Sequence, residues 1–191
     1  MNKFVYNAPT EWTPKEHFPD LSKEKLIAID LETCDTQLTT HGSGWATNNG
    51  YVTGIAVATA NWEGYYPIAH NGGNLDKTKV LDWFKTVAKL DCPKIFHNAS
   101  YDIGWLKSLG ITVNGKVHDT MISSALLDEN RYSYTLNSLA KDKLGRTKNE
   151  DLLIAAAKEF GVDPKKEMYK LPSMHVGEYA EYDARLTYDL Y

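Results

Sequence analysis

Apolar and polar positions along the chain follow two patterns, one typical of buried strands and one typical of helices. Residues 26–29 are all apolar and lead directly into Asp30, as expected of a strand that is buried on both faces. Residues 51–59 and 64–69 are rich in β-branched and aromatic side chains and predict an antiparallel hairpin. In residues 75–90 the apolar positions recur at helical spacing. The chain therefore starts with strands and then combines strands with helices.

The rest of the chain continues these patterns, and turn residues separate the elements. The first strand is expected at 25–31, further strands at 93–97 and 113–117, and further helices at 100–110, 119–127, 135–144, 150–160 and 177–190. Asp119 is suited to cap the helix that follows it, and Gly110 is suited to end one. Residues 34–50, rich in Gly, Asn and Thr, predict a long loop. This order of elements predicts the α/β class, with a mixed five-stranded sheet flanked by helices.

Composition indicates one ordinary folded domain. The chain has 191 residues, of which 42% are hydrophobic and 24% charged, and this is enough for one sizeable core. We expect residues 1–24, which contain three prolines, to form an irregular N-terminal arm and residues 25–191 to form a single domain. The two cysteines match no metal-ligand spacing, and no apolar run is long enough for a membrane span or a signal peptide. We therefore expect a cytoplasmic protein with no membrane association.

The first predicted strand runs into two acidic residues, Asp30 and Glu32. Because side chains alternate along a strand, both carboxylates point to the same face, while Leu31 points back into the core. Two neighbouring carboxylates repel each other and are costly to desolvate, whereas a divalent cation between them would stabilise both. The pair therefore predicts a metal site. The simpler alternative is a pair of acids that faces solvent at the end of a strand.

Two further acids can reach the first pair in such a fold. Asp102 lies in the first turn of the helix after the strand at 93–97, where the helix dipole favours a negative charge, and Asn98 precedes it at the strand end. Tyr179 and Asp183 are four residues apart on the last helix and share one face. Each feature alone also suits an ordinary helix acid or an amphipathic helix. Sites in α/β sheets gather at strand ends, so we expect the acids to meet there.

Three short patterns occur in a fixed order, namely Asp30-x-Glu32, Asn98-x-x-x-Asp102 and Tyr179-x-x-x-Asp183. In this combination the sequence resembles the 3′–5′ exonuclease superfamily named DEDD for its four acidic residues, in the subgroup with a tyrosine in the third motif (DEDDy). Within it, the chain is most similar to the proofreading domain of phage-type family-A DNA polymerases. The resemblance covers about residues 24–191 and includes His118–Met121. His175 lies at the wrong spacing for the histidine subgroup.

The resemblance implies a ribonuclease-H-like fold and a 3′–5′ exonuclease that removes nucleoside monophosphates from the 3′ end of DNA. It also implies two divalent ions, Mg²⁺ or Mn²⁺. The implied metal ligands are Asp30, Glu32, Asp102 and Asp183. Tyr179 completes the implied catalytic set by orienting the attacking water, while Thr33 and Asn98 match positions that contact the terminal nucleotide. We expect Tyr179 to stay neutral, because an unperturbed tyrosine pKa of about 10 makes it a poor base at neutral pH.

Charge is unevenly distributed along the chain, although its net value of −4 does not favour a general nucleic-acid coat protein. Residues 131–170 hold nine basic and six acidic residues, which suits either a polyanionic substrate or solvated helix faces. We expect a monomer that acts on a single-stranded DNA 3′ end in a bacterial or phage-infected cell. The chain ends at Tyr191, directly after the last predicted helix, and from this we expect a domain that belongs to a polymerase or works with one.

Three other functions remain open. A free-standing nuclease of the same superfamily would trim RNA or structured DNA 3′ ends with the same motifs. A binding module would hold single-stranded nucleic acid without cutting it, but such a module has no need of four acids. A hydrolase of small phosphodiesters is the third alternative. The motifs do not distinguish DNA from RNA as the substrate.

Overall fold

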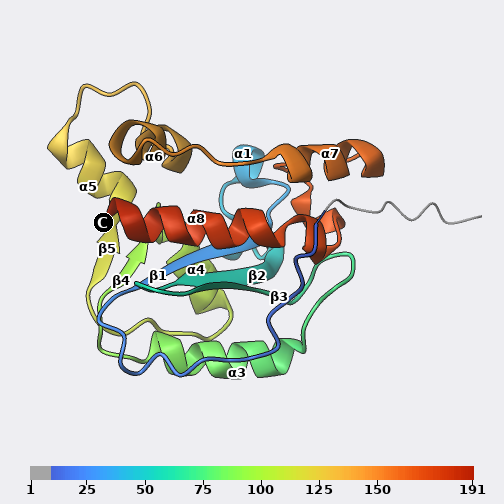
Figure 1. Ribbon diagram of the computed structural model, residues 1–191, viewed down its shortest axis with the longest axis horizontal. Helices are drawn as coiled ribbons and strands as arrows, with labels where there is room; N and C mark the ends of the chain where they lie inside the picture. The colour runs from blue at the N-terminus through green and yellow to red at the C-terminus, as the bar shows by residue number, and fades with distance from the viewer. Residues whose placement is uncertain (1–9) are drawn as a thin grey trace, which may run out of the picture.

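The computed structural model describes residues 10–191 and is built on one five-stranded sheet (Figure 1). In spatial order, the strands are β3 (Glu63–Pro67), β2 (Tyr51–Ala58), β1 (Ile27–Cys34), β4 (Lys94–Phe96) and β5 (Val117–Asp119). β2 is antiparallel to both of its neighbours, whereas β1, β4 and β5 run parallel to one another. The predicted mixed five-stranded α/β sheet is confirmed.

Helices cover both faces of this sheet. They are α1 (Leu38–His41), α2 (Gly44–Thr47), α3 (Lys77–Ala88), α4 (Ala99–Ser108), α5 (Thr120–Leu127), α6 (Leu136–Leu144), α7 (Asp151–Phe160) and α8 (Gly177–Leu190). α8 crosses one face, α3 lies on the opposite face, and α6 and α7 lie beyond α8 (Figure 1). Two 3₁₀ turns, Met168–Lys170 and Ser173–His175, precede α8. Within residues 10–191, no helix has both the length and the apolar character to cross a membrane.

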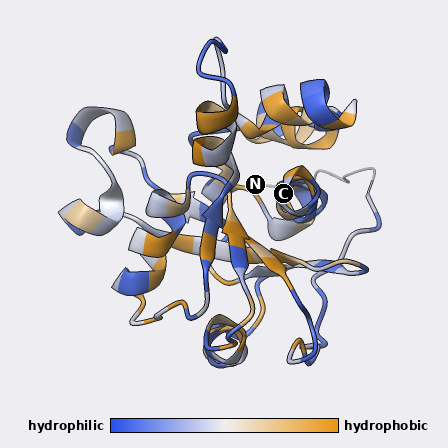
Figure 2. Ribbon diagram, turned by 90° about the vertical axis from the view of Figure 1, so that its left-hand side faces the viewer, coloured by the Kyte–Doolittle hydropathy of each residue, from blue (hydrophilic) through white to orange (hydrophobic). Residues whose placement is uncertain are grey.

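β1 is central because its side chains reach the cores on both faces of the sheet. Ile27 and Ile29 join the core that α3 and α4 cover. Ala28 lies in the other core, under α8, and the alternation of a strand gives Asp30 and Glu32 that same face. Figure 2 shows apolar residues concentrated in the sheet, between the helical layers. Burial of these apolar surfaces is the main favourable term that holds the layers together.

Small residues line the contact between α8 and the sheet. Ala180 and Ala184 of α8 are fully buried in a core that includes Ala28, Ala56 and Ala58 of the central strands. Because alanine side chains are short, the helix and sheet backbones can approach closely without leaving voids. The polar residues on the flanks of α8 are thereby brought next to β1.

β1 is longer than predicted, and this changes the setting of the acidic pair. The sequence predicted a strand that ends at Leu31, but the strand continues to Cys34. Its last two residues pair with the start of β2 beyond a bulge between Glu32 and Thr33. Asp30 and Glu32 therefore lie within a strand and not at its end.

Residues 34–50 are not the open loop that the sequence predicted. They contain α1 and α2, and two contacts fix them. Asp35 accepts a hydrogen bond from the N–H of Gly44 at 2.9 Å. The Trp45 ring covers Gly104 of α4 so closely that a Cβ there would lie 2.2 Å from the indole. Helices of four residues are too short to show a period, which is why the hydrophobic pattern missed them.

The strand predicted at 113–117 is wrong, because β5 begins only at Val117. The preceding residues turn around Lys94, the first residue of β4. Lys94 is fully buried, and its ammonium donates to the carbonyl of Asn114 at 3.1 Å and to two carbonyls just before β4. Gly115 permits the turn with a φ of +80°.

Residues 10–24 contain no helix or strand and contact both layers. The Trp12 ring lies against Gly177 at the start of α8, where a Cβ would be 2.1 Å from the indole. Further along, a proline carbonyl accepts a hydrogen bond from the indole of Trp83 in α3 at 2.9 Å. Residues 1–9 of the expected arm lie outside the described residues, and the limits of the domain stay a prediction.

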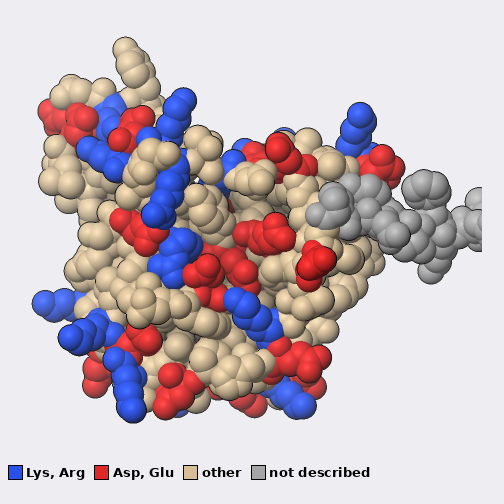
Figure 3. Space-filling view, in the orientation of Figure 1, with Lys and Arg blue, Asp and Glu red and all other residues tan. Residues whose placement is uncertain are grey.

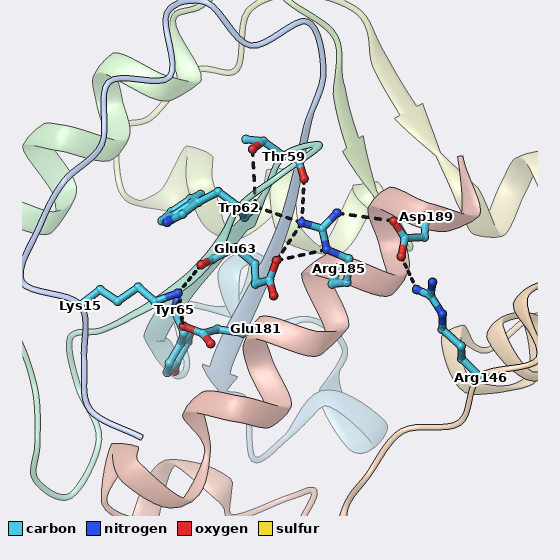
Figure 4. Close-up of polar contacts among 9 residues, drawn as sticks. All are labelled: Lys15, Thr59, Trp62, Glu63, Tyr65, Arg146, Glu181, Arg185 and Asp189. Atoms are coloured by element: carbon cyan, nitrogen blue, oxygen red, sulfur yellow. Dashed lines mark hydrogen bonds and ion pairs between the residues drawn. The ribbon is translucent and has the colours of Figure 1, made fainter. Parts of the chain in front are cut away.

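Arg185 fixes α8 to the hairpin of β2 and β3 (Figure 4). Its guanidinium donates to two hairpin carbonyls at 2.7 and 3.1 Å and pairs with Glu63 at 2.8 Å. One turn earlier, Glu181 accepts a hydrogen bond from the N–H of Tyr65 at 3.1 Å. Because Asp183 lies between Glu181 and Arg185 in the sequence, these bonds fix the position of its backbone.

Replacing Arg185 with methionine should lower the free energy of unfolding by about 2 kcal/mol, because two carbonyls and Glu63 lose a charged donor. Denaturant titration of the wild-type and Arg185→Met chains measures the difference. Arg146→Met is the matched control, since Arg146 pairs with Asp189 at the surface, where such pairs contribute less than about 1 kcal/mol. Equal losses in the two variants would contradict the role given to Arg185.

Candidate active site

Three carboxylates from two distant parts of the chain converge between α8 and β1. Asp30 and Glu32 come from β1 and Asp183 comes from α8, and each offers an oxygen within 4.8 Å of the others. Asp183 is buried, while the two strand acids are half-buried. Strand alternation turns the first pair toward α8, and the small residues between the layers let the helix bring the third acid close.

Asp102 approaches the same place from α4. It lies in the first turn of that helix, is 4% exposed and feels the charges of Asp30 and Glu32. Its Oδ1 accepts a hydrogen bond from the N–H of Leu31 at 3.0 Å, beyond the point where the short β4 pairs with β1. Asp102 thus holds β1 at Leu31, the residue between the two strand acids. It does not belong to the group of three acids whose oxygens all lie within 4.8 Å of one another.

Burial raises the pKa of all four acids, and the charge of a neighbouring acid in the cluster adds to the shift for Asp30, Glu32 and Asp102. Burial and the charge of Asp183 raise the pKa of Asp30 to about 7, although the Lys148 ammonium opposes the shift. Burial, with the charges of Asp30 and Asp183, raises the pKa of Glu32 well above its ordinary value. The pKa values of Asp102 and Asp183 are also raised, chiefly by burial. Without a bound cation the cluster therefore retains protons near neutral pH.

The donor atoms of this cluster fit a hard divalent cation. Oδ1 of Asp183 is buried and has no hydrogen-bond partner. In the described part of the chain, no hydrogen bond reaches the carboxylates of Asp30 or Glu32 either. Buried oxygens without partners are costly, and carboxylate oxygens are the ligands that Mg²⁺ and Mn²⁺ prefer. The residues present are therefore suited to hold such ions.

Tyr179 lies one turn before Asp183 on α8, and an ammonium links the two side chains. Lys148, between α6 and α7, contacts Oδ2 of Asp183 and lies 3.3 Å from the Tyr179 hydroxyl. Burial and the charge of Asp183 raise the pKa of Tyr179 above its ordinary value. The phenol is therefore neutral and keeps its proton as a hydrogen-bond donor. No local spacing in the sequence connects Lys148 to α8, so its place at the site could not be predicted from the sequence.

Thr33, directly after Glu32 in β1, lines a hollow of about 180 Å³. The Thr33 hydroxyl lies 2.9 Å from that of Tyr101, which donates to Asp35 at 3.0 Å. The residues around the hollow are Thr33, Asp35, Thr36, Leu38, Thr39, Tyr101, Lys165 and Lys166. An aromatic ring, several hydroxyls, one carboxylate and two lysine side chains thus surround this space. Residues of α1 form part of its wall, so the unexpected fold of 34–50 shapes it.

Asn98 lies elsewhere, at the start of α4, in a left-handed conformation with a φ of 68°. Its N–H donates to Asp119 at 3.1 Å, and the N–H of Ala99 donates to the same carboxylate at 2.7 Å. Asp119 also caps α5, as the sequence predicted. One carboxylate thus fixes the junction from which Asp102 projects. Contact between Asn98 and a nucleotide stays a prediction.

Several basic residues in the 131–170 segment already form ion pairs within the protein, so fewer of them are free to bind a polyanion than their number indicates. Arg131, Arg146, Lys165 and Lys170 each pair with an acidic side chain. Lys148 is turned into the acid cluster. Figure 3 shows basic and acidic side chains next to one another on the face that carries α8. The segment therefore presents no continuous basic surface on this face.

The chain matches the family model described as a 3'-5' exonuclease over residues 7–191. It is 38% identical over 184 residues to a DNA-directed DNA polymerase of Pseudomonas phage M6. That match covers 90% of this chain but 28% of the phage protein, so the chain spans little more than a quarter of this relative's length.

Two solved nuclease structures share the fold. Trypanosoma brucei RNase D has a TM-score of 0.64 and 20% identity, with 89% of this chain and 57% of that chain covered. Brucella melitensis NrnC with bound Mg2+ has a TM-score of 0.60 and 18% identity, with 93% and 75% covered. At such identities the likeness shows the fold alone, and it confirms the expected ribonuclease-H-like fold. Since the family model matches nearly its whole length, the chain belongs to the 3'-5' exonuclease family.

Proposed function

We propose that this chain is the proofreading exonuclease of a DNA polymerase, in the subgroup with a tyrosine in the third motif. It removes nucleoside monophosphates from a single-stranded DNA 3′ end. The convergence of Asp30, Glu32 and Asp183 is the observation that carries the proposal. Similarity to a phage DNA polymerase supports a polymerase domain or subunit as its partner. The proposal includes a monomer with the exonuclease domain at residues 25–191, in the cytoplasm of a bacterial or phage-infected cell.

In this proposal four acids hold two divalent ions, Mg²⁺ or Mn²⁺. The ligands are Asp30, Glu32, Asp102 and Asp183. Bound ions of this kind make water a stronger nucleophile and offset negative charge on the departing 3′ oxygen. The acids become ligands by releasing the protons that they retain in the metal-free protein. The negative charges of the four carboxylates repel one another in the metal-free protein, and the same charges would attract the divalent ions.

Tyr179 positions the attacking water. Its hydroxyl is neutral, so it donates a hydrogen bond and does not act as a base. Its oxygen accepts a hydrogen bond from Lys148, and the hydroxyl also interacts with the Asp183 carboxylate, so two neighbours fix its position. Glu32, on the strand below, can accept a hydrogen bond from the same water. Correct orientation of the reacting oxygen is worth a large part of such a rate enhancement.

The hollow beside Thr33 is proposed to take the terminal nucleotide. Tyr101 offers a ring against which a base can stack, and Thr33 offers a hydroxyl. Lys165 and Lys166 at the same hollow can pair with phosphates of the strand. Asn98 is proposed to contact the same nucleotide from the start of α4.

A free-standing nuclease that trims RNA or structured DNA 3′ ends is the second candidate. The fold shared with RNase D favours it. Its chemistry at the acid cluster is the same, so the two candidates differ in substrate and partner. Parallel digestion of end-labelled single-stranded DNA, mismatched duplex and RNA, with Mg²⁺, Mn²⁺ or chelator, separates them. Stepwise loss from the 3′ side of DNA, stopped by chelator, is the expected result, and preferential loss from RNA would favour the second candidate.

Replacing Asp30 with Asn and Glu32 with Gln should reduce nucleotide release by at least about a hundredfold, because several kcal/mol of metal-assisted stabilisation are lost. Both changes nearly preserve side-chain volume, so circular dichroism and melting temperature should show an intact fold. Glu178→Gln, an exposed acid on α8, is the control and should retain full activity. Unchanged turnover in the Asp30→Asn, Glu32→Gln variant would refute the metal site.

Tyr179→Phe should lower kcat by about ten- to hundredfold, because the water loses a positioning contact. Calorimetric titration should show unchanged Mn²⁺ affinity, since the phenol is not a ligand. Tyr182→Phe on the same helix controls for the loss of a hydroxyl. A parallel loss of metal binding and turnover in Tyr179→Phe would exclude the water-positioning role.

Metal affinity should rise with pH, because ions must displace protons from carboxyls whose pKa is raised, that of Asp30 to about 7. We expect calorimetry to show at least about tenfold tighter Mg²⁺ binding at a pH of about 7.5 than at about 5.5. The metal-free protein should show the reverse trend in stability. A raised carboxyl pKa means that the unfolded chain ionises first, so stability falls as pH rises from about 4 to about 7.

Asp30→Asn removes the group with a pKa of about 7 and should weaken both pH dependences without abolishing them, because burial also raises the pKa of Glu32, Asp102 and Asp183. Equal Mg²⁺ affinity of the wild-type chain at the two pH values would show that the cluster carries no protons for the metal to displace.

A further inference from the structure

Lys148 is buried in the acid cluster, unlike the other basic residues of its segment. Its ammonium contacts Oδ2 of Asp183, lies 3.3 Å from the Tyr179 hydroxyl and 4.8 Å from the centroid of the Tyr179 ring. The side chain of Lys148 is 10% exposed and that of Asp183 is 7% exposed. Among residues 10–191, no other basic side chain forms a hydrogen bond or ion pair with any of the four acids.

Lys148 does not need to be buried in order to form an ion pair. Moving an ammonium out of water costs far more than leaving it exposed, unless partners in the interior replace its hydration. Arg146, two residues earlier, pairs with Asp189 while 48% exposed. A basic residue of this segment can therefore form an ion pair at the surface. The inward position of Lys148 therefore indicates a role at the site.

The backbone around Lys148 is held from both sides. The N–H of Lys148 donates to Oδ1 of Asn137 in α6 at 3.3 Å. The side chain of Asn149 accepts a hydrogen bond from the N–H of Asp151 at the start of α7 at 3.2 Å. The segment is thus tied to two helices, and these ties set the reach of the ammonium.

We propose that Lys148 is a positioning residue of the exonuclease site, which orients Asp183 and Tyr179 with one ammonium. It takes Oδ2 of Asp183 and leaves Oδ1, which has no protein partner, for a metal ion. It also donates to the oxygen of Tyr179 and so sets the position of that hydroxyl beside Asp183. The inference rests on the proposed function and deepens it, because it explains how two α8 side chains keep one geometry.

Lysine ammonium NMR tests the contact without any turnover. A hydrogen-bonded, buried ammonium exchanges its protons slowly, so the metal-free chain should give slow-exchange signals for Lys148 and for Lys94. Lys94 serves as an internal control, because backbone carbonyls hold it away from the site. Asp183→Asn should shift or remove the Lys148 signal and leave that of Lys94 in place. Absence of the Lys148 signal in the wild-type chain, with Lys94 visible, would overturn the proposal.

Titration with Mg²⁺ then shows whether Lys148 keeps its contact with Asp183 or loses it when the ion binds. If Lys148 keeps Oδ2 while the ion takes Oδ1, its signal should shift and persist at saturating Mg²⁺. Disappearance of the Lys148 signal on Mg²⁺ binding would mean that the ammonium is released, and it would overturn the positioning role. A wild-type chain that binds no Mg²⁺ would instead refute the proposed function itself, so the two failures are distinguishable.

Kinetics of Lys148→Met supply the second measurement. We expect kcat on single-stranded DNA to fall at least tenfold, KM to change less than threefold, and Mn²⁺ to bind at least as tightly as in the wild-type chain. Lys148→Arg keeps a charged donor and should recover part of kcat. Arg146→Met, which removes a cation from the same segment, should leave kcat within twofold. Unchanged kcat in Lys148→Met, or weaker Mn²⁺ binding together with a lower melting temperature, would overturn the proposal.

A double variant shows whether Lys148 acts through Tyr179. In the Tyr179→Phe background, Lys148→Met should lower kcat by a smaller factor than in the wild-type chain, because one of the two groups that it orients is gone and only Asp183 remains. A full tenfold loss in that background would mean that Lys148 does not act through the phenol and would contradict the shared role.

Discussion

Like-charged carboxylates held together in a water-poor layer are the constraint on which this structure depends. The repulsion between Asp30, Glu32 and Asp183 opposes the packing of α8 on β1. Apolar burial on both faces of the sheet supplies the free energy that keeps the layers together. Because burial and neighbouring charges raise the pKa of Asp30 and of Glu32, the metal-free cluster can lower this repulsion by holding protons. A divalent cation bound there, as we propose, would relieve it without them.

α8 turns this constraint into a defined geometry. Its alanines face the sheet, Glu181 and Arg185 hold the hairpin on one flank, and Tyr179 and Asp183 reach the acid cluster on the other. Both polar pairs are spaced four residues apart, so each lies on one line along the helix. The bonds of the first pair therefore limit the movement of the second. Lys148, which lies outside α8, contacts both Tyr179 and Asp183 and further limits their movement.

The sequence revealed the acids because local rules place them. Strand alternation puts Asp30 and Glu32 on one face, and helix spacing joins Tyr179 to Asp183. Other parts of the site depend on contacts between distant segments, which no local period encodes. Lys148 reaches Asp183 from a loop. Asp119 accepts four backbone hydrogen bonds from the starts of α4 and α5, and this depends on the sheet that brings the two helices together.

The errors in the fold have similar causes. α1 and α2 are too short for a hydrophobic period, and the early part of the predicted strand at 113–117 is used to close a turn around buried Lys94. The extension of β1 to Cys34 follows from pairing with β2 across a bulge, which the apolar run alone does not reveal. The types of the longer elements were predictable, whereas the short helices α1 and α2, the element bounds and the tertiary polar contacts were not.

Anomalous scattering from a crystal grown or soaked with Mn²⁺ tests the central claim most directly, because it locates the ion without reference to turnover. The account predicts manganese peaks between Asp30, Glu32 and Asp183, with an oxygen of each acid in the coordination shell. Manganese found elsewhere, with none at these three carboxylates at saturating concentration, would contradict it.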